Sequence, residues 1–379
     1  MAFVHCGSEE CAKSELDLFQ IAPTQTSIEK SIYIEVPPLS AVTESAPIDF
    51  FIAGNGIDYM DLNNTLLYLC CMIVKGDGTE LATDAEVGLV NYPVASIFSQ
   101  LDVTLGDRLV SQSNNCYPYR AFIESVLNYS DDTLATQFSA VDVKIKLTRS
   151  KDAFCLMGSA AEGFKLRIVS ASLFVKKVRV APGVRLGHAE ALLASNAKYP
   201  MDRVGMKVFS IPAGSRVSNQ ENLFLGQLPK MLVLGFVDND AFSGSYTKNP
   251  FHFKHYDINF VALYVDGEQV PTKPLQPDFE AGRCVREYMN LVQTAGKHMK
   301  DRSLLIDREE FAQGYTLFAF DLSPDQESAD HYSLIKTGNL RAEIRFGKAL
   351  TVTVNMIVYG VFDNVIEINQ RRNVLFDYM

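Results

Sequence analysis

Short runs of β-branched and aromatic residues, separated by turn residues at close spacing, constrain the fold of this 379-residue chain most strongly. The run VDVKIKLT places Val141, Val143, Ile145 and Leu147 on one face. A period of two predicts a half-buried antiparallel strand. Similar runs cover residues 164–169, 207–211, 340–346 and 351–359. The pattern therefore predicts a mainly β protein.

Two glycine-containing turns fit this interpretation. Val265-Asp-Gly-Glu268 and Leu105-Gly-Asp107 each place Gly beside Asp between two apolar runs. Glycine and aspartate are favoured where a tight hairpin needs positive φ. Both segments are predicted to join neighbouring strands.

Few segments have a helical pattern: three lie beyond the N-terminal arm, and residues 12–19 of the arm are marginally helical. Residues 119–128 follow Pro118 and place Phe122, Ile123, Val126 and Leu127 on one face, and residues 285–292 repeat this spacing. A third segment, residues 188–195, is expected to be closed by the Tyr-Pro pair at 199–200. Helices are thus expected as short insertions in a β fold.

The position of the third helix suggests the domain organisation. A chain of this length has a prior of about two to three domains. Residues 1–24 are predicted to form an N-terminal arm, 25–184 a first β-sandwich, 185–203 a helical connector and 204–379 a second β-sandwich. Each half has the size of one sandwich.

Composition excludes several classes of protein. A formal net charge of −10 argues against direct, sequence-specific nucleic-acid binding, and the basic strip Phe174–Val180 is interpreted as a solvated strand face. The longest apolar runs, residues 64–74 and 231–237, are shorter than the roughly 20 residues of a bilayer span. The first ten residues lack a secretory pattern, so synthesis in the cytosol is expected.

The seven cysteines lie at positions 6, 11, 70, 71, 116, 155 and 284. Their odd number and irregular spacing favour reduced, mostly buried thiols over disulfides or a zinc site. Cys116 and Cys284 were considered as nucleophiles, and packing is the preferred interpretation.

No motif with a catalytic mechanism is present, so no catalytic, cofactor or metal site is predicted. His252 and His255 come nearest to a metal pair, but residues three apart on a strand point to opposite faces. Asp238 and Asp240 could offer oxygens to Ca²⁺, yet they are more typical of a turn with side-chain to backbone hydrogen bonds.

Several segments, taken in order, resemble the hexon-like major capsid proteins of Polinton/Maverick elements and adintovirus-like viruses. They are Tyr117–Tyr129, Lys207–Pro212, Gln220–Pro229, Asn249–Tyr256, Leu263–Pro271 and Asn364–Ile368. Residues 318–325 and 332–341 also look like the second-domain pattern of capsid proteins of large DNA viruses. The resemblance runs from about Cys11 to the C-terminus.

This resemblance implies an all-β fold of two tandem eight-stranded jelly-roll sandwiches, a double jelly roll, with a few short inserted helices. It implies a major capsid protein located in the virion, without enzymatic activity. Its expected partners are two further copies in a homotrimeric, pseudo-hexameric capsomer, neighbouring capsomers, and penton or minor capsid proteins that complete an icosahedral shell. An internal membrane and the host site of assembly are left open.

A second interpretation remains open. Jelly rolls are also common in lectins, so the chain could be a receptor- or carbohydrate-binding module on a virion surface. The sequence also departs from its relatives between Tyr129 and Val141, where its connection is shorter than theirs. Contacts formed by that loop in the family therefore cannot be transferred to this chain.

Overall fold

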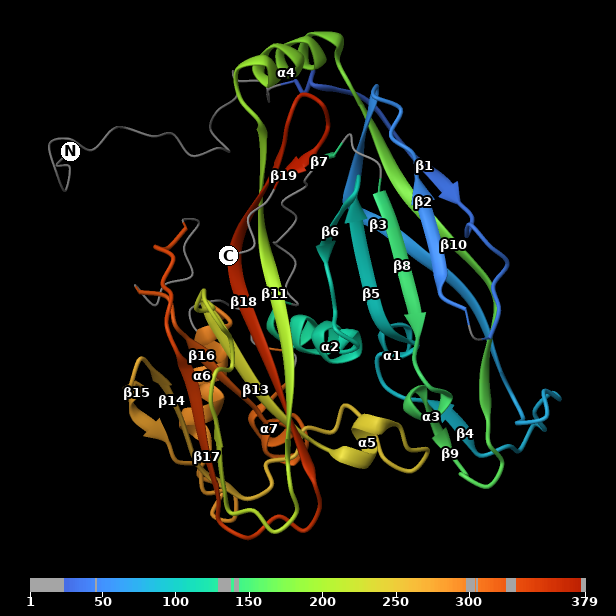
Figure 1. Cartoon of the computed structure of the whole chain (residues 1–379). Coiled ribbons are helices and arrows are strands. Elements are labelled where there is room, and N and C mark those ends of the chain that lie inside the picture. The colour runs from blue at the N-terminus through green and yellow to red at the C-terminus, as the bar shows by residue number, and fades with distance from the viewer. Residues whose placement is uncertain are drawn as a thin grey trace, which may run out of the picture.

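The computed structural model describes residues 24–44, 46–128, 138–139, 143–297, 304, 306–324 and 332–375. The chain forms two β-sandwiches that stand side by side, one from each half of the sequence (Figure 1). The predicted arm, apart from Thr24, lies outside the described residues, and so do Cys6, Cys11 and Val141.

The first sandwich contains two four-stranded antiparallel sheets, with the strand orders β1-β10-β3-β7 and β2-β8-β5-β6. Its strands are β1 (Ile28–Val36), β2 (Ile48–Ile52), β3 (Asp58–Val74), β5 (Phe98–Leu105), β6 (Arg108–Ser111), β7 (Phe138–Ser139), β8 (Val143–Arg149) and β10 (Lys165–Val180). A small sheet of β4 (Val87–Leu89) and β9 (Leu156–Gly158) lies apart from these two.

The second sandwich has the strand orders β11-β18-β13-β16 and β12-β17-β14-β15. Its strands are β11 (Ala197–Ile211), β12 (Val217–Gln220), β13 (Met231–Asp238), β14 (Ile258–Val265), β15 (Glu268–Leu275), β16 (Leu317–Asp321), β17 (Leu340–Phe346) and β18 (Val354–Ile368), and β19 (Val374–Leu375) adds to β18.

Both sandwiches follow one topology. When the eight strands of each are counted in chain order, one sheet joins strands one, eight, three and six, and the other joins two, seven, four and five. This is the jelly-roll arrangement, in which the first strand pairs with the last. The predicted fold class, two tandem eight-stranded jelly rolls, is confirmed.

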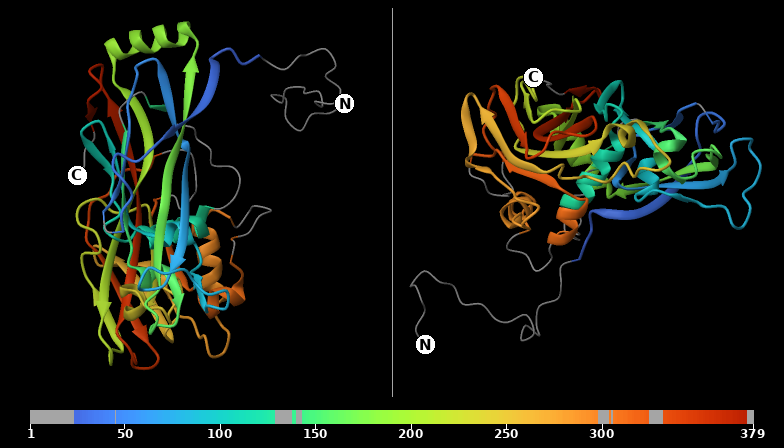
Figure 2. Two further views of the ribbon diagram at one scale, coloured as in Figure 1. Left: turned by 90° about the vertical axis from the view of Figure 1, so that its right-hand side faces the viewer. Right: turned by 90° about the horizontal axis from the view of Figure 1, so that it is seen from below.

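Seven short helices lie between the strands within the described ranges. They are α1 (Pro93–Ser96), α2 (Tyr117–Asn128), α3 (Asp152–Cys155), α4 (Pro182–Ala194), α5 (Asn239–Ser243), α6 (Val285–Thr294) and α7 (Arg308–Gln313). No helix among the described residues is long and apolar enough to cross a membrane. Figure 2 shows that α4 lies at one end of the elongated molecule, beyond the sandwiches.

Three apolar clusters hold the molecule together. One fills the first sandwich and includes Phe50 and Val143, and another fills the second sandwich and includes Phe236 and Ile344. The third contains α2 and lies between the two sandwiches. Burial of apolar surface therefore stabilises each sandwich and also the junction between them.

The predicted strand faces and turns agree with the structure. In β8, Val143 and Leu147 are buried while Lys144 and Lys146 are exposed. The Val265–Glu268 turn joins β14 to β15, with positive φ at both of its central residues. A turn with positive φ at both central residues matches the right-handed twist of the two strands that it joins.

The connector differs from the prediction. Helix α4 begins at Pro182 instead of residue 188, because proline fits the first turn of a helix, where its missing N–H is not needed. Residues 197–203 were assigned to a helical connector, but they belong to β11. Pro200 is tolerated there because β11 is an edge strand of its sheet.

The short connection after Tyr129 also differs from the prediction of a simple loop. Phe138 and Ser139 form β7, which pairs with Asp61 and Met60 of β3 and completes the first sheet. The remaining residues of this connection lie outside the described ranges.

Candidate assembly surfaces

The residues considered for metal binding do not form a common site. The Nε2 atom of His252 lies 3.0 Å from the carbonyl oxygen of Gln313. His255 accepts a hydrogen bond from the Asp257 N–H at Nδ1, and its ring stacks on Phe279. Across the described ranges, no three His, Cys, Asp or Glu side chains are grouped so that they could hold a metal ion.

Asp238 makes the side-chain to backbone hydrogen bond that the turn interpretation predicted, although the segment begins a short helix instead of forming a turn. The Asp238 carboxylate accepts a hydrogen bond from the Asp240 N–H at 2.8 Å and caps α5. Lys248 Nζ lies 2.9 Å from Asp238 and 2.8 Å from Asp240. The ammonium group of this lysine therefore neutralises the oxygens that were considered for Ca²⁺.

The cysteines divide into two groups. Cys116, Cys155 and Cys284 are buried, and burial raises the pKa of Cys116 to about 11 and that of Cys155 to about 12. These thiols stay protonated at neutral pH, as packing residues would. Cys70 and Cys71 are exposed, so the prediction of buried thiols is wrong for this pair. Cys70 lies on the outer side of β3, as Tyr68 and Met72 do. Cys71 lies on the opposite side and pairs with Ile168, so a missing cover does not explain its exposure.

The two sandwiches are joined by an aromatic cluster around α2. Phe122 stacks on Phe251 and on Phe253, with 5.3 Å between ring centroids in each pair, and on Tyr315 at 5.9 Å. Phe122 belongs to the first half of the chain and its three partners to the second. Since aromatic side chains bury large areas, this cluster fixes the position of one sandwich relative to the other.

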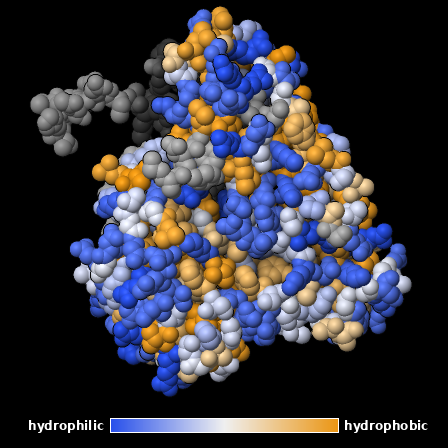
Figure 3. Space-filling view, in the orientation of Figure 1, coloured by the Kyte–Doolittle hydropathy of each residue, from blue (hydrophilic) through white to orange (hydrophobic). Residues whose placement is uncertain are grey.

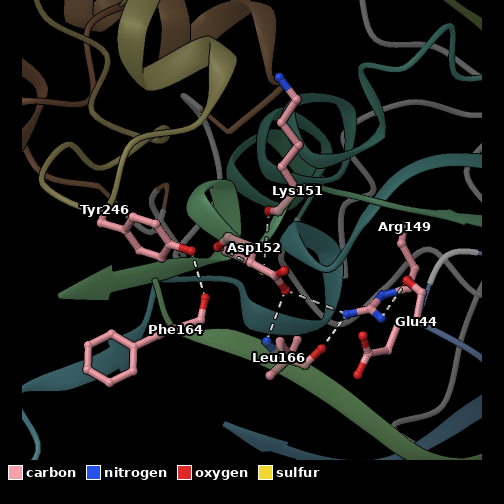
Figure 4. Close-up of polar contacts among 8 residues, drawn as sticks. Glu44, Arg149, Lys151, Asp152, Phe164, Leu166 and Tyr246 are labelled. Carbon is pink, nitrogen blue, oxygen red and sulfur yellow. Dashed lines mark hydrogen bonds and ion pairs between the residues drawn. The ribbon is translucent and has the colours of Figure 1, made fainter. Parts of the chain in front are cut away.

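Hydrogen bonds to the Phe164 region reinforce the same junction. The Tyr246 hydroxyl donates to the Phe164 carbonyl oxygen at 2.6 Å (Figure 4). The Gly158 N–H donates to the Tyr246 carbonyl oxygen at 2.9 Å. Asn249 Nδ2 donates to Asn91 Oδ1 at 2.7 Å. These bonds connect the loop after α5 with the first sandwich.

An ion pair supports this contact from the first sandwich. Arg149 donates to the carbonyl oxygens of Glu44 and Leu166, and its guanidinium lies 3.8 Å from Asp152 (Figure 4). Asp152 in turn accepts the Leu166 N–H at 2.9 Å. The backbone that carries Phe164 is thereby held in place for Tyr246.

Removing the Tyr246 hydroxyl tests the polar part of the junction. We expect Tyr246→Phe to lower the free energy of unfolding by about 1 kcal/mol, because the Phe164 carbonyl oxygen loses its donor. Denaturant unfolding measures the change. Tyr332→Phe is the matched control, since Tyr332 is half exposed, lies outside the junction and should tolerate the change. Equal losses in the two variants would refute this role of the hydroxyl.

Strand β3 carries apolar side chains on both of its surfaces. Leu67 and Leu69 pack against the first core. Leu66, Tyr68 and Met72 alternate with them on the opposite surface and are 58%, 57% and 37% exposed. Continuous apolar runs are typical of strands that are covered on both sides.

Neighbouring strands extend this apolar surface. We define the outer face of the first sandwich as Tyr33 of β1, Val169 of β10, and Leu66, Tyr68, Cys70 and Met72 of β3; all six residues are exposed. A grouped exposed apolar surface marks a site of interaction with another molecule.

The equivalent sheet of the second sandwich is covered. In β13, the strand equivalent to β3, Leu232, Leu234 and Phe236 face the second core, while Val233 and Val237 face the cluster around α2. The same alternation therefore buries both surfaces of this strand. The first sandwich has the corresponding apolar strand without a corresponding cover in the described part of the chain.

Ion pairs lie at one end of the outer face. Arg179 Nε donates to Asp58 at 2.8 Å, and Asn55 Nδ2 donates to the same carboxylate at 2.8 Å. Hydrogen bonds from Arg179 and Asn55 hold the pKa of Asp58 below its ordinary value. Lys176 lies 3.1 Å from the fully buried Asp61. These pairs connect β10 to β3.

The lowered pKa of Asp58 makes the stability of the folded protein depend on pH. A carboxylate with a lowered folded-state pKa adds stability above its unfolded value of about 3.9 and loses this contribution as the pH falls through the folded pKa. We therefore expect Asp58→Asn to be less stable than the wild type at pH 7, with a difference that shrinks below about pH 4 and vanishes only once the pH is below the folded pKa of Asp58. Thermal melts across this range measure it, and Asp84→Asn, on an exposed turn, is the control. A difference that does not vary with pH would contradict this role of Asp58.

A curated protein from a nematode is similar to this chain in sequence over almost its whole length. No profile of a known protein family matches this chain. An uncharacterised protein of Caenorhabditis elegans is 23% identical over 413 residues, which span 93% of this chain and 99% of that protein.

Several solved structures of viral proteins share the double-sandwich architecture of this chain. A chain in the cryo-EM structure of the Sputnik virophage superposes with a TM-score of 0.68 at 10% identity, over 99% of this chain and 94% of that one. The major capsid protein of Faustovirus gives 0.59 at 7% identity, over 92% of both chains. The mavirus major capsid protein gives 0.53 at 10% identity, over 100% of this chain and 97% of its own. This chain therefore has the double jelly-roll fold found in viral major capsid proteins.

Proposed function

We propose that this chain is the major capsid protein of a virus or virus-like genetic element, with a structural and not a catalytic role. The uncovered outer face of the first sandwich is the observation that carries the proposal. Two jelly rolls held rigidly side by side form a building block, and an apolar side surface supplies the contact by which such blocks assemble. The likeness of the whole chain to viral capsid proteins supports this assignment.

The proposed assembly is a homotrimer. Three copies with two sandwiches each contribute six similar upright blocks, which gives a pseudo-hexameric capsomer. Within one chain, the apolar sheet of the second sandwich is covered at the junction, so we propose that the corresponding sheet of the first sandwich is covered by the next copy. Neighbouring capsomers and penton or minor capsid proteins then complete an icosahedral shell in the virion.

We also propose that the two jelly rolls are separate domains, with the boundary at α4. The strands before this helix and the strands after it pair only within their own sandwich in the described ranges. The junction around α2 then acts as an interface between domains.

Light scattering coupled to size-exclusion chromatography tests the assembly. The expected mass is about 126 kDa, which is three times the 42.1 kDa of the chain. A stable 42.1-kDa species at every concentration, salt and pH would reject the trimer.

A further inference from the structure

A pocket of about 720 Å³ lies beneath α4, at the end of the molecule. Figure 1 shows α4 crossing this end above the turn between β18 and β19. The pocket is lined by α4, by the beginning of β11, by that turn, and by Tyr59 of β3. Its volume is in the range of sites that hold small ligands. Both sandwiches contribute to it, so the fold holds its walls in place.

The charge of this pocket is opposite to the charge of the whole chain. Arg185, Lys198 and Arg372 line it, and no Asp or Glu does. The chain as a whole carries a formal charge of −10. In the part of the chain that the structure describes, none of these three side chains has an acidic partner within ion-pair distance. Three cations therefore share one concave site without neutralisation.

Arg185 gives the second observation. Its Nε atom is buried and has no hydrogen-bond partner among the described residues. A buried donor without an acceptor destabilises the folded protein, and more so when the donor is charged. Such a group indicates an acceptor that comes from outside the chain.

Other residues position the cationic groups. Gly56 has a φ of +72°, and a Cβ atom there would collide with the Arg372 guanidinium, so glycine leaves room for that side chain. The Tyr59 hydroxyl lies 2.7 Å from His188 Nδ1. When the hydroxyl donates to Nδ1, the Nε2 atom of His188 carries a hydrogen and becomes a further donor.

We propose that this pocket binds a phosphate group, carried either by a membrane-lipid headgroup or by a small soluble phosphate compound. Guanidinium groups match phosphate oxygens with paired hydrogen bonds, and an ammonium group adds a point charge. A bound phosphate would neutralise all three cations, and the Arg185 side chain would have to turn its Nε atom toward the pocket in order to donate to it. The site lies within one chain, so it does not depend on the proposed assembly.

The side chains of α4 around the pocket bear on whether the phosphate comes from a lipid headgroup or from a soluble compound. None of the α4 side chains is buried, and Leu186 and Leu193 are 62% and 70% exposed. Figure 3 shows hydrophobic surface at this end of the molecule, beside hydrophilic atoms. Exposed leucines next to cationic side chains are the combination by which surface helices bind anionic bilayers.

Two probes test the proposal with the full chain. Inositol hexakisphosphate, followed by titration calorimetry, reports the soluble phosphate. Sedimentation with phosphatidylserine vesicles, compared with pure phosphatidylcholine vesicles, reports the headgroup. We expect saturable binding of at least one probe, and at least a tenfold loss in the double variant Arg185→Gln/Arg372→Gln. Lys144→Gln/Lys146→Gln removes the same charge from the exposed side of β8 and should bind as the wild type does.

A third variant identifies the source of the phosphate. If Leu186→Ser/Leu193→Ser loses only vesicle binding, the ligand is a lipid headgroup; if it retains all binding, the ligand is soluble. Thermal melts establish that each variant is folded. The proposal is overturned if neither probe binds, if the arginine variant binds as tightly as the wild type, or if the lysine control loses as much. The mass of the oligomer is measured in parallel, so failed assembly and failed phosphate binding give separate results.

Discussion

Replacing Leu66 and Tyr68 with aspartate yields a folded monomer that no longer assembles. Both side chains are more than half exposed on the outer face of the first sandwich, so aspartate costs little in the isolated chain. In the proposed trimer the same positions are covered by another copy, and each unpaired buried carboxylate would cost several kcal/mol. The free-energy cost of burying two such charges in each interface is larger than the binding free energy that an interface of ordinary size can lose and still form.

The measurement is the mass in solution together with the thermal melt. The double variant is expected near 42.1 kDa with an almost unchanged melting temperature. Leu66→Met/Tyr68→Phe keeps the apolar area and serves as the control, which should assemble as the wild type does. Trimers of the aspartate variant would show that this face is not an interface between copies.

Replacing Phe122 with alanine separates the two sandwiches and strongly destabilises the chain. Phe122 is 1% exposed and contacts aromatic rings from the other half of the sequence. Truncating a buried phenylalanine typically costs about 3–5 kcal/mol, because the cavity is only partly filled by relaxation. A loss of this size is a large part of the stability of an ordinary protein.

Denaturant unfolding with a probe in each sandwich measures this effect. We expect an earlier transition and a loss of coincidence between the two halves, because the junction couples them. Phe51→Ala is the control: Phe51 is 43% exposed on β2, so its loss should be less than about 1.5 kcal/mol. If the Phe122 variant unfolds in one transition at the wild-type denaturant concentration, the junction contributes nothing to the rigidity of the block.

The strands and turns could be predicted from the sequence because they depend on local patterns. Alternation placed Val143 and Leu147 on the buried side of β8, and the Asp-Gly pair fixed the turn between β14 and β15. The pairing of the first strand of each sandwich with the last came from the family resemblance, since contacts between residues far apart in sequence leave no local pattern.

The predictions that were wrong concern residues whose structure depends on neighbouring strands and not on the local sequence. Pro200 usually ends a helix or strand, but the edge position of β11 lets it remain in the sheet. Cys70 lies in an apolar run that predicts burial, yet its side chain is on the outer side of β3 and is exposed. Neither the junction around Phe122 nor the pocket beneath α4 could be found from the sequence, because each combines residues from both halves.

Electron microscopy of the purified, concentrated protein tests the capsid assignment most directly. The account predicts six-sided particles built from three copies, and closed shells under conditions of salt and pH that favour assembly. Monomers of a single size in every condition, without capsomers or shells, would contradict it.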